Sequence, residues 1–342
     1  MKKVTHTSSR KIEHIDINLN KDVASTNTNG LDKFQFVHEA LPEINLNEID
    51  LSQNLFGRAV SAPILISSMT GGADEAKDIN FILAEAAEEM GIAMGVGSQR
   101  AAIEEPSLAP TFNVRSVAPN ILLFANLGAI QLNYGYGIDE CQKAVDMIEA
   151  DALILHLNPL QEAVQPEGDV NWHGILNKIE IICKKMPVPV IIKEVGWGIS
   201  AKTAKKLSEI GIQAIDVAGA GGTSWSQVEM YRAKSENLAR IAETFIGWGI
   251  PTADSIKQIR ESLPEMKVIA SGGLRSGLDI AKCIALGASM GGMAGPFLKA
   301  AIKSTSATVQ EISNIQRTLQ ISMFAAGAKD LSVLQKTPLI KQ

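Results

Sequence analysis

The stretch KVIASGGLRSGLDIAKCIALGASMGGMAG, residues 267–295, contains in order a strand, a glycine turn, a helix and a second strand. Its two ends are short runs built almost wholly of apolar or small residues, as in strands that are buried on both faces of a parallel sheet. Between them, Ser276 and Asp279 form an N-terminal capping pattern, and Gly287 follows the last helical turn. The stretch therefore predicts one β-α-β unit.

The same unit repeats along the chain from about residue 60. The runs that predict buried strands are 62–69, 91–98, 120–128, 151–158, 188–195, 214–222, 267–273 and 288–295. Segments with helical spacing of apolar residues separate them, and one of these begins after Ser200 and ends at Gly211. Strand and helix that alternate eight times predict the α/β class, as a (β/α)8 TIM barrel. A doubly wound open sheet is the alternative, but no GxGxxG motif follows the first strand.

Two further segments complete the predicted domain organisation. Residues 1–35 are polar, and 23–30 have little to bury, so we expect a mobile N-terminal arm or lid, with a disordered terminus as the alternative. Residues 36–342 would form the barrel, with a helical C-terminal tail from about residue 304. A long connection, 223–250, follows the sixth strand on the side where barrel active sites lie.

Composition and charge exclude several classes of function. Hydrophobic residues make up 46% of the 342 residues and the formal net charge is −5, which argues against a nucleic-acid binder that relies on basic charge. No run approaches the ~18 apolar residues of a membrane helix, and no signal-peptide pattern follows Lys2 and Lys3. The widely spaced Cys141, Cys183 and Cys283 fit neither a disulfide framework nor a zinc site, so we expect a cytoplasmic protein.

Polar side chains gather where the predicted strands end, whereas the strand centres are apolar. These ends are 67–72, 97–100, Asn126, 156–162, 193–194, 219–223, 271–277 and 294–295. The carboxyl ends of the strands carry the active site in barrels of this kind. The sequence therefore predicts a site at this rim.

The ends of the last two strands predict a phosphate site. Ser271, Gly272 and Gly273 precede a capped helix, and Ala294 and Gly295 follow the eighth strand. Free backbone N–H groups and the positive end of a helix dipole favour an anion there. The alternative is that these glycines only make tight turns.

Other strand ends supply single candidates with open alternatives. Lys193 could pair with an anionic cofactor ring or a phosphate, or could be a solvated strand end. Asn126 and Ser98 could hydrogen-bond a planar heterocycle, and His156 could equally be a satisfied core histidine. Asn126 and Ser98 are each a weak signal when taken alone.

Two short motifs predict further anion and metal chemistry. Arg10 and Lys11, followed by His14, make a dense cationic group in the arm that would suit a phosphate. Gln161 and Glu162 project together from a loop, where one carboxylate with phosphate oxygens is an adequate magnesium site. A plain surface Gln-Glu pair is the alternative for the second motif.

Motifs spread from residue 10 to about residue 300 carry a family resemblance. They are RKIEHI (10–15), SSMTGG (67–72), GVGSQR (95–100), NLGA (126–129), HLNPLQE (156–162), the Lys193 strand, AGAGGTSW (218–225), ASGGLRSG (270–277) and MAGP (293–296). With them the chain resembles the type 2, flavin-dependent isopentenyl diphosphate isomerases. HLNPLQE and GSQR are the most specific, since SGG and AG occur in many FMN barrels.

The resemblance implies a (β/α)8 barrel that uses FMN in its reduced form, NADPH as the reductant, and Mg²⁺. It implies interconversion of isopentenyl diphosphate and dimethylallyl diphosphate in isoprenoid biosynthesis without net redox change, by a homotetramer or larger homo-oligomer. Carried over position by position, the residues that would hold FMN are Ser68, Met69, Thr70, Ser98, Asn126, Lys193, Thr223, Gly273, Leu274, Arg275, Ala294 and Gly295. Those that would bind the diphosphate or line its pocket are Arg10, Lys11, His14, Ser98, Gln99, Arg100, His156 and Gln161. Glu162 would bind Mg²⁺, and Trp225 and Glu229 would border the reacting end of the substrate.

Gln161 and His156 are the catalytic candidates. A neutral amide cannot be a strong acid, so we hypothesise that the reduced flavin carries the proton while Gln161 orients the alkene. The nearest alternative function is an FMN-dependent dehydrogenase of a phosphorylated or 2-hydroxy acid substrate. A non-catalytic phosphate-binding module is the remaining alternative. The cationic arm and the HLNPLQE loop favour the isomerase.

Overall fold

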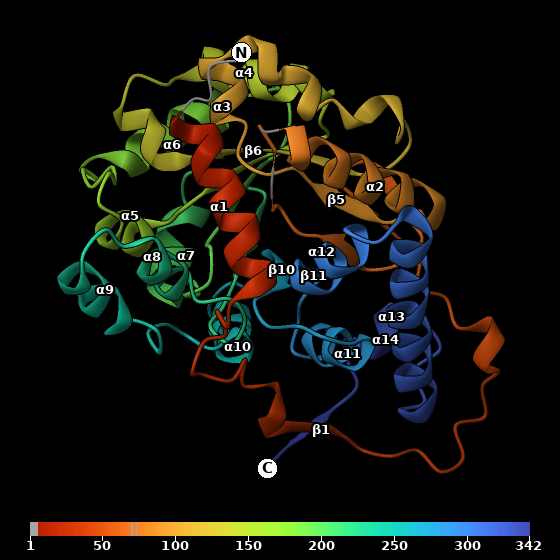
Figure 1. Cartoon of the computed structure of the whole chain (residues 1–342). Coiled ribbons are helices and arrows are strands. Elements are labelled where there is room, and N and C mark those ends of the chain that lie inside the picture. The colour runs from red at the N-terminus through yellow and green to blue at the C-terminus, as the bar shows by residue number, and fades with distance from the viewer. Residues whose placement is uncertain (1–5, 70, 73) are drawn as a thin grey trace.

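Eight parallel strands close into a barrel in the order β10-β11-β4-β5-β6-β7-β8-β9 (Figure 1). The computed structural model describes residues 6–69, 71–72 and 74–342. The barrel strands are β4 (Ile64–Ile66), β5 (Ala93–Gly95), β6 (Leu123–Gly128), β7 (Ala152–His156), β8 (Val190–Lys193), β9 (Ala214–Asp216), β10 (Lys267–Ser271) and β11 (Met290–Met293). Each strand lies inside one of the predicted runs, so the (β/α)8 prediction is confirmed.

The inward faces of these strands change from apolar to polar toward their carboxyl ends. One buried cluster fills the interior, with Leu65, Ala93, Phe124, Ile154, Ile191, Ala214, Ile269 and Met290. Side chains alternate between the two faces of a strand, so the next inward residue is two positions further along. Those residues are Ser67, Gly95, Asn126, His156, Lys193, Asp216, Ser271 and Gly292. The barrel thus presents a mostly polar floor at its carboxyl end.

Helices surround the barrel and follow local sequence signals. They are α2 (Asp74–Met90), α3 (Arg100–Glu104), α4 (Ile138–Ile148), α5 (Pro159–Val164), α6 (Ile175–Lys185), α7 (Ala201–Ser208), α8 (Trp225–Arg232), α9 (Glu236–Glu243), α10 (Thr252–Ser262), α11 (Gly277–Ala285), α12 (Gly295–Ala301), α13 (Thr305–Ala325) and α14 (Leu331–Leu334). Short 3₁₀ turns are η1 (Leu31–Lys33), η2 (Leu46–Glu48), η3 (Pro106–Thr111), η4 (Val114–Ser116) and η5 (Ala129–Asn133). The predicted caps form, because the Ser276 side chain accepts from the Asp279 N–H and the Ser200 side chain from the Thr203 N–H.

The N-terminal segment lies against the carboxyl side of the barrel. Helix α1 (His6–Asn20) contacts α8, and Figure 1 shows it crossing in front of the barrel. The expectation that 23–30 bury little is wrong for Val23, which is 8% exposed and packs against Val228 and Trp225. Asn29 also donates from Nδ2 to the Gly273 carbonyl at 2.8 Å. Whether the arm moves stays a prediction.

The C-terminal tail is helical up to α14 but ends as a strand. Helix α13 packs on α2, α11 and α12 outside the barrel. Strand β12 (Leu339–Lys341) then pairs antiparallel with β1 (Phe34–Phe36). The backbone N–H and C=O groups of each short segment find hydrogen-bond partners in the other. A hairpin of β2 (Gln53–Leu55) and β3 (Arg58–Val60) places Leu55 and Val60 in the cluster of the barrel interior.

Candidate functional site

Asn126 and His156 meet at the barrel mouth. The Asn126 Oδ1 atom lies 2.8 Å from His156 Nδ1, and Asn126 Nδ2 donates to the Val96 carbonyl at 3.1 Å. These bonds fix the orientation of the amide, which is only 4% exposed. His156 is half-buried on the same inward face. Both therefore line the site, and His156 is not enclosed in the apolar core.

Lys193 is buried at the end of β8 and is not a solvated strand end. Its Nζ atom donates to the Glu194 carbonyl at 2.7 Å and lies 3.8 Å from Asp216 Oδ2. Asp216 Oδ1 accepts from Ser271 Oγ at 2.5 Å. Asp216 was not among the site residues predicted from the sequence. Its signal was a carboxylate two positions after Ala214, on the inward face of a predicted strand.

The loops after β9 and β10 approach too closely for any side chain. Gly272 and Gly273 have φ angles of 105° and 77°, which favour glycine. A Cβ at Gly272 would lie 2.1 Å from the Gly219 carbonyl oxygen, and one at Gly273 would lie 2.3 Å from that of Gly221. Leu274 is buried beside them, and the Arg275 N–H donates to Asp279 Oδ2 at 2.9 Å. These glycines therefore do more than turn the chain, because they bring two loops together.

The start of α12 leaves open space on the other side of this junction. Ala294 is the N-cap residue of α12, and a Cβ added to Gly295 would meet nothing within 4 Å. The orphan N–H groups of a helix N-terminus suit a phosphate. Gly273 and Gly295 thus lie at the ends of adjacent strands, as the predicted phosphate site requires.

Serines at the end of β4 fit the remaining part of a flavin site. The Oγ atoms of Ser67 and Ser68 are buried and have no hydrogen-bond partner within the described part of the chain. Met69 is half-buried beside them, whereas Thr70 lies outside the described residues. Unpaired buried hydroxyls are costly, so a ligand that pairs them explains their position. With Lys193 and the glycine junction, these residues fit FMN.

Helix α1 brings cationic and aromatic groups to this rim. Lys11 Nζ donates to the Ser98 carbonyl at 2.7 Å and lies 4.8 Å from the centroid of the Phe112 ring. His14 Nε2 lies 3.2 Å from Glu229 Oε1, and its ring meets Trp225 edge to face at 5.0 Å. Arg10 lies in the same helix, but its side chain is outside the described residues.

Thr223 ties α1 to the loop after β9. Its Oγ1 atom donates to Asn18 Oδ1 at 3.4 Å, and its backbone forms a bridge with Ala24. The side chain is half-buried. Its backbone therefore fixes the arm beside the predicted flavin site.

Gln161 and Glu229 form a buried pair beneath α1. Gln161 Nε2 donates to Glu229 Oε1 at 3.0 Å, and Arg232 Nη1 donates to Glu229 Oε2 at 2.6 Å. Burial raises the pKa of Glu229, but the hydrogen bond and charge of His14 and the charge of Arg232 outweigh it, so the net pKa is below the ordinary value. A carboxylate therefore stays ionised at the predicted reacting end. Arg232 was missing from the predicted site because it lies about two helical turns beyond the motif that ends at Trp225.

The expectation that Gln161 and Glu162 project from a loop is wrong, because both lie buried in helix α5, where Pro159 starts the helix right after β7. The Glu162 carboxylate accepts several hydrogen bonds there. Its donors include Asn158 Nδ2 at 2.8 Å, Gln165 Nε2 at 2.8 Å and the Asp169 N–H at 2.7 Å. No cluster of three or more His, Cys, Asp or Glu side chains that could hold a metal occurs among the described residues. A cation at Glu162 would take most of its ligands from substrate and water, which suits Mg²⁺.

Gln99 and Arg100 differ in where their side chains point. The Gln99 side chain is fully buried, where Nε2 donates to the Ala144 carbonyl at 2.7 Å and Oε1 accepts from the Asn126 N–H at 2.9 Å. The structure therefore directs this side chain away from the rim, to join β6 and α4. Arg100 is half-buried, with Nε donating to Glu104 at 2.6 Å and Nη1 to Asp169 at 3.1 Å.

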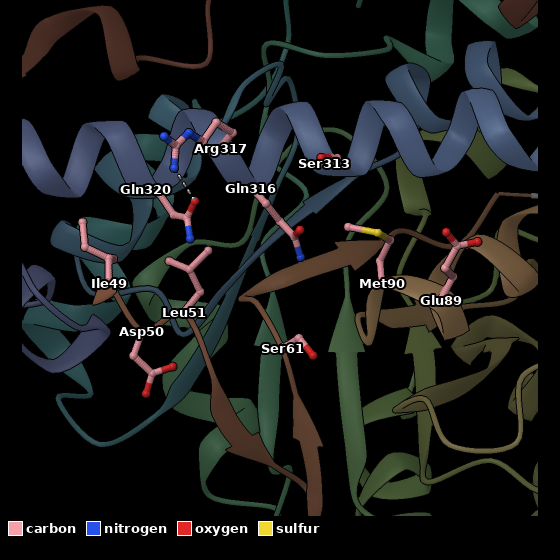
Figure 2. A pocket seen from close by; sticks show the side chains of 10 residues that line it. All are labelled: Ile49, Asp50, Leu51, Ser61, Glu89, Met90, Ser313, Gln316, Arg317 and Gln320. Atoms are coloured by element: carbon pink, nitrogen blue, oxygen red, sulfur yellow. Dashed lines mark hydrogen bonds between the residues drawn. The ribbon is translucent and has the colours of Figure 1, made fainter. Parts of the chain in front are cut away.

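A separate pocket of ≈ 510 Å³ lies at the opposite, N-terminal end of the strands. Figure 2 shows Arg317 hydrogen-bonded to Gln320 on α13, while the Asp50 side chain points away from both. Of the predicted site residues that the structure describes, none lines it. This pocket therefore lies apart from the candidate site at the carboxyl end.

The comparisons with known proteins agree with this geometry. The profile of the family described as FMN-dependent dehydrogenase matches residues 6–110 and 160–341. The isopentenyl-diphosphate delta-isomerase of Rickettsia bellii is 54% identical over 330 residues, covering 96% of this chain and 96% of the relative. Its counterpart from a Nostoc species is 53% identical over 330 residues, covering 96% of this chain and 94% of the relative.

Solved structures share the fold at much lower identity. Mandelate oxidase with (S)-2-phenylpropionate matches with a TM-score of 0.68 and 16% identity, covering 96% of this chain and 94% of that chain. A mandelate oxidase mutant with benzaldehyde gives a TM-score of 0.68 at 16% identity, and the match covers 97% of this chain and 94% of that chain. These structures support the barrel alone. The near-full-length sequence matches establish more: the chain belongs to the isopentenyl-diphosphate delta-isomerases, within the FMN-dependent dehydrogenase family.

Proposed function

We propose that the chain interconverts isopentenyl diphosphate and dimethylallyl diphosphate, with reduced FMN and Mg²⁺ bound and NADPH as the reductant of the flavin. The observation that carries this proposal is the closure of α1 over the barrel mouth. Lys11 then lies beside Ser98, and His14 lies beside Glu229. Glu229 in turn accepts a hydrogen bond from Gln161. A cationic arm over the predicted flavin site is the arrangement that a small diphosphate needs.

The reaction adds a proton at the terminal methylene carbon and removes one from C2, so it needs acid and base but no net electron transfer. Reduced FMN would supply the proton-transferring group at the ring. The chain's own residues supply binding and orientation. Lys11, His14 and Arg100 would hold the diphosphate, and its binding energy would fix the small apolar tail.

Gln161 and Glu229 would shape the reacting end. The bond from Gln161 Nε2 to Glu229 Oε1 fixes the amide, so its carbonyl has a set direction. Asn158 Nδ2 donates to that carbonyl oxygen at 3.3 Å and to Glu162 at 2.8 Å. One asparagine thus joins the orienting amide to the predicted magnesium ligand. Helix α1 would exclude water while the proton moves.

Proton NMR in heavy water tests the proposal. The protein is loaded with FMN, reduced anaerobically, and mixed with isopentenyl diphosphate and Mg²⁺. New methyl signals of dimethylallyl diphosphate, with deuterium incorporated and no net flavin oxidation, are expected. Substrate-linked flavin oxidation or reduction without these signals would support the dehydrogenase alternative instead. Tight FMN binding with no turnover of any diphosphate would support a binding module.

We also propose a homotetramer or larger homo-oligomer in the cytoplasm. The family resemblance supports this assembly. Within the described ranges, no helix has the length and apolar character needed to span a bilayer. Light scattering after size-exclusion chromatography would give the mass, and a monomer near 36.6 kDa would contradict self-association.

A further inference from the structure

Asp216 is a carboxylate with no exposed surface that the proposed chemistry does not use. It ends β9, whose register pairs it with Lys193 at the end of β8. In parallel strands, paired residues point to the same side of the sheet. Both side chains therefore face inward, at the polar floor of the barrel mouth.

The contacts of Asp216 divide between its two oxygens. Oδ1 accepts from Ser271 Oγ at 2.5 Å and from the Ala218 N–H at 3.3 Å. Oδ2 has no hydrogen-bond partner among the described residues and lies 3.8 Å from Lys193 Nζ. A neutral acceptor would satisfy Ser271 and Ala218 equally well. The charge of Asp216 is therefore explained by Lys193.

Lys193 has one such carboxylate within ion-pair distance in the described part of the chain. Its Nζ atom also donates to the backbone carbonyl of Glu194, at 2.7 Å. The Glu194 carboxylate points elsewhere, because its Oε2 accepts from the N–H groups of Val195, Gly196 and Trp197 at 2.7, 2.7 and 2.5 Å. Asp216 thus provides the local counter-charge in a site where charges are little screened by water.

We propose that Asp216 is a positioning residue for the flavin, which acts by holding the Lys193 ammonium and offsetting its charge. This inference rests on the FMN-binding part of the proposed function. An uncompensated lysine would favour the electron-rich reduced flavin over the oxidised form. The Lys193–Asp216 pair presents a weaker net charge, so Asp216 limits the preference of the site for reduced FMN.

Redox titration of bound FMN tests this inference without using isomerase activity. Wild-type, Asp216→Asn and Ser271→Ala proteins are titrated with dithionite against a dye of known potential. FMN dissociation constants are measured for the oxidised and reduced forms. Asp216→Asn keeps an acceptor for Ser271 but removes the charge, whereas Ser271→Ala removes the hydrogen bond and keeps the charge. Near-ultraviolet circular dichroism confirms folding of each protein.

Asp216→Asn should raise the ratio of reduced to oxidised FMN affinity about tenfold, which is about 30 mV upward for a two-electron couple. Ser271→Ala should change that ratio less than about threefold, or about 15 mV. If Asp216→Asn does not fold, Asp216→Ser should give the same upward shift, because it also removes the charge. No shift, a downward shift, or an equal shift in Ser271→Ala would overturn the inference.

The outcomes separate this inference from the proposed function. A protein that isomerises its substrate, but whose potential is unmoved by Asp216→Asn, refutes the role of Asp216 alone. A protein that binds FMN and shows the expected shift, but makes no dimethylallyl diphosphate, refutes the proposed reaction alone. Failure of the wild-type protein to bind FMN refutes both, and its absorption spectrum shows this directly.

Discussion

Replacing Gly273 with alanine should separate the loops that form the predicted phosphate site. Gly273 has a φ angle of 77°, a conformation that costs an L-residue about 1–2 kcal/mol. The added Cβ would also lie 2.3 Å from the Gly221 carbonyl oxygen and 2.9 Å from the Gly222 nitrogen. Both contacts are backbone atoms, so the loops after β9 and β10 must move apart. Overpacking of this kind costs about 1–3 kcal/mol.

Gly57→Ala is the matched control. Gly57 has a φ angle of 83°, but a Cβ there would meet nothing within 4 Å, and it lies in the β2–β3 turn away from the site. It should therefore lose about 1–2 kcal/mol of unfolding free energy from backbone strain alone. Gly273→Ala should lose about 2–5 kcal/mol, the sum of strain and overpacking.

Cofactor affinity distinguishes the two variants further. If about 2 kcal/mol of the Gly273→Ala cost falls on FMN binding, the dissociation constant rises about 30-fold. Gly57→Ala should leave it unchanged. Urea unfolding and fluorescence titration of the apoprotein with FMN measure both quantities. Equal stability losses in the two variants, or undiminished FMN affinity in Gly273→Ala, would refute the reasoning from close loop approach.

Three other perturbations test different parts of the site. Lys11→Ala should raise KM for isopentenyl diphosphate at least about tenfold, the loss expected for one charge-assisted hydrogen bond, without changing FMN affinity. Steady-state kinetics and FMN titration check this, and an unchanged KM would place the ammonium outside the diphosphate site. Glu162→Gln should raise the Mg²⁺ concentration needed for half-maximal activity, because a neutral amide is a weaker ligand for a hard cation. A Mg²⁺ titration with unchanged midpoint would exclude Glu162 as a ligand. Burial raises the pKa of Glu194 to about 7, so the folded protein holds a proton that the unfolded chain releases near pH 4.5. Its contribution to stability should be full below that pH and be lost as pH rises through about 7, on the order of 3 kcal/mol. Urea unfolding at pH 5 and pH 8 should show this loss in the wild type and not in Glu194→Gln, and the same slope in both would contradict it.

Local signals were sufficient to predict the barrel. Each strand was short and apolar enough to be recognised without its neighbours, and serine caps and glycine stops marked helices such as α7 and α11. The apolar-to-polar change along each inward face also placed the site at the carboxyl ends. These features depend on residues a few positions apart, which the chain determines before any tertiary contact forms.

The directions of the side chains at the rim could not be predicted from the sequence. Gln99 stands in the GSQR motif beside rim residues, yet its amide turns inward to bond Ala144 and Asn126. Nothing local distinguishes it from Arg100, which reaches Asp169 at the rim. The difference arises because the start of α3 packs against β6 and α4, and these segments lie more than 25 residues away along the chain.

Sequence by itself determined the (β/α)8 class, the glycines at the strand ends and the family motifs, because short apolar runs, helix caps and glycine positions are recognised from residues a few positions apart. Tertiary structure alone decided that α1 closes over the mouth, that Lys11 meets Ser98, and that β1 pairs with β12. It also decided that Asp216 lies opposite Lys193. Such pairs depend on strand register and on contacts between distant segments, and these are fixed only when the barrel closes and all of its buried polar groups must find partners together.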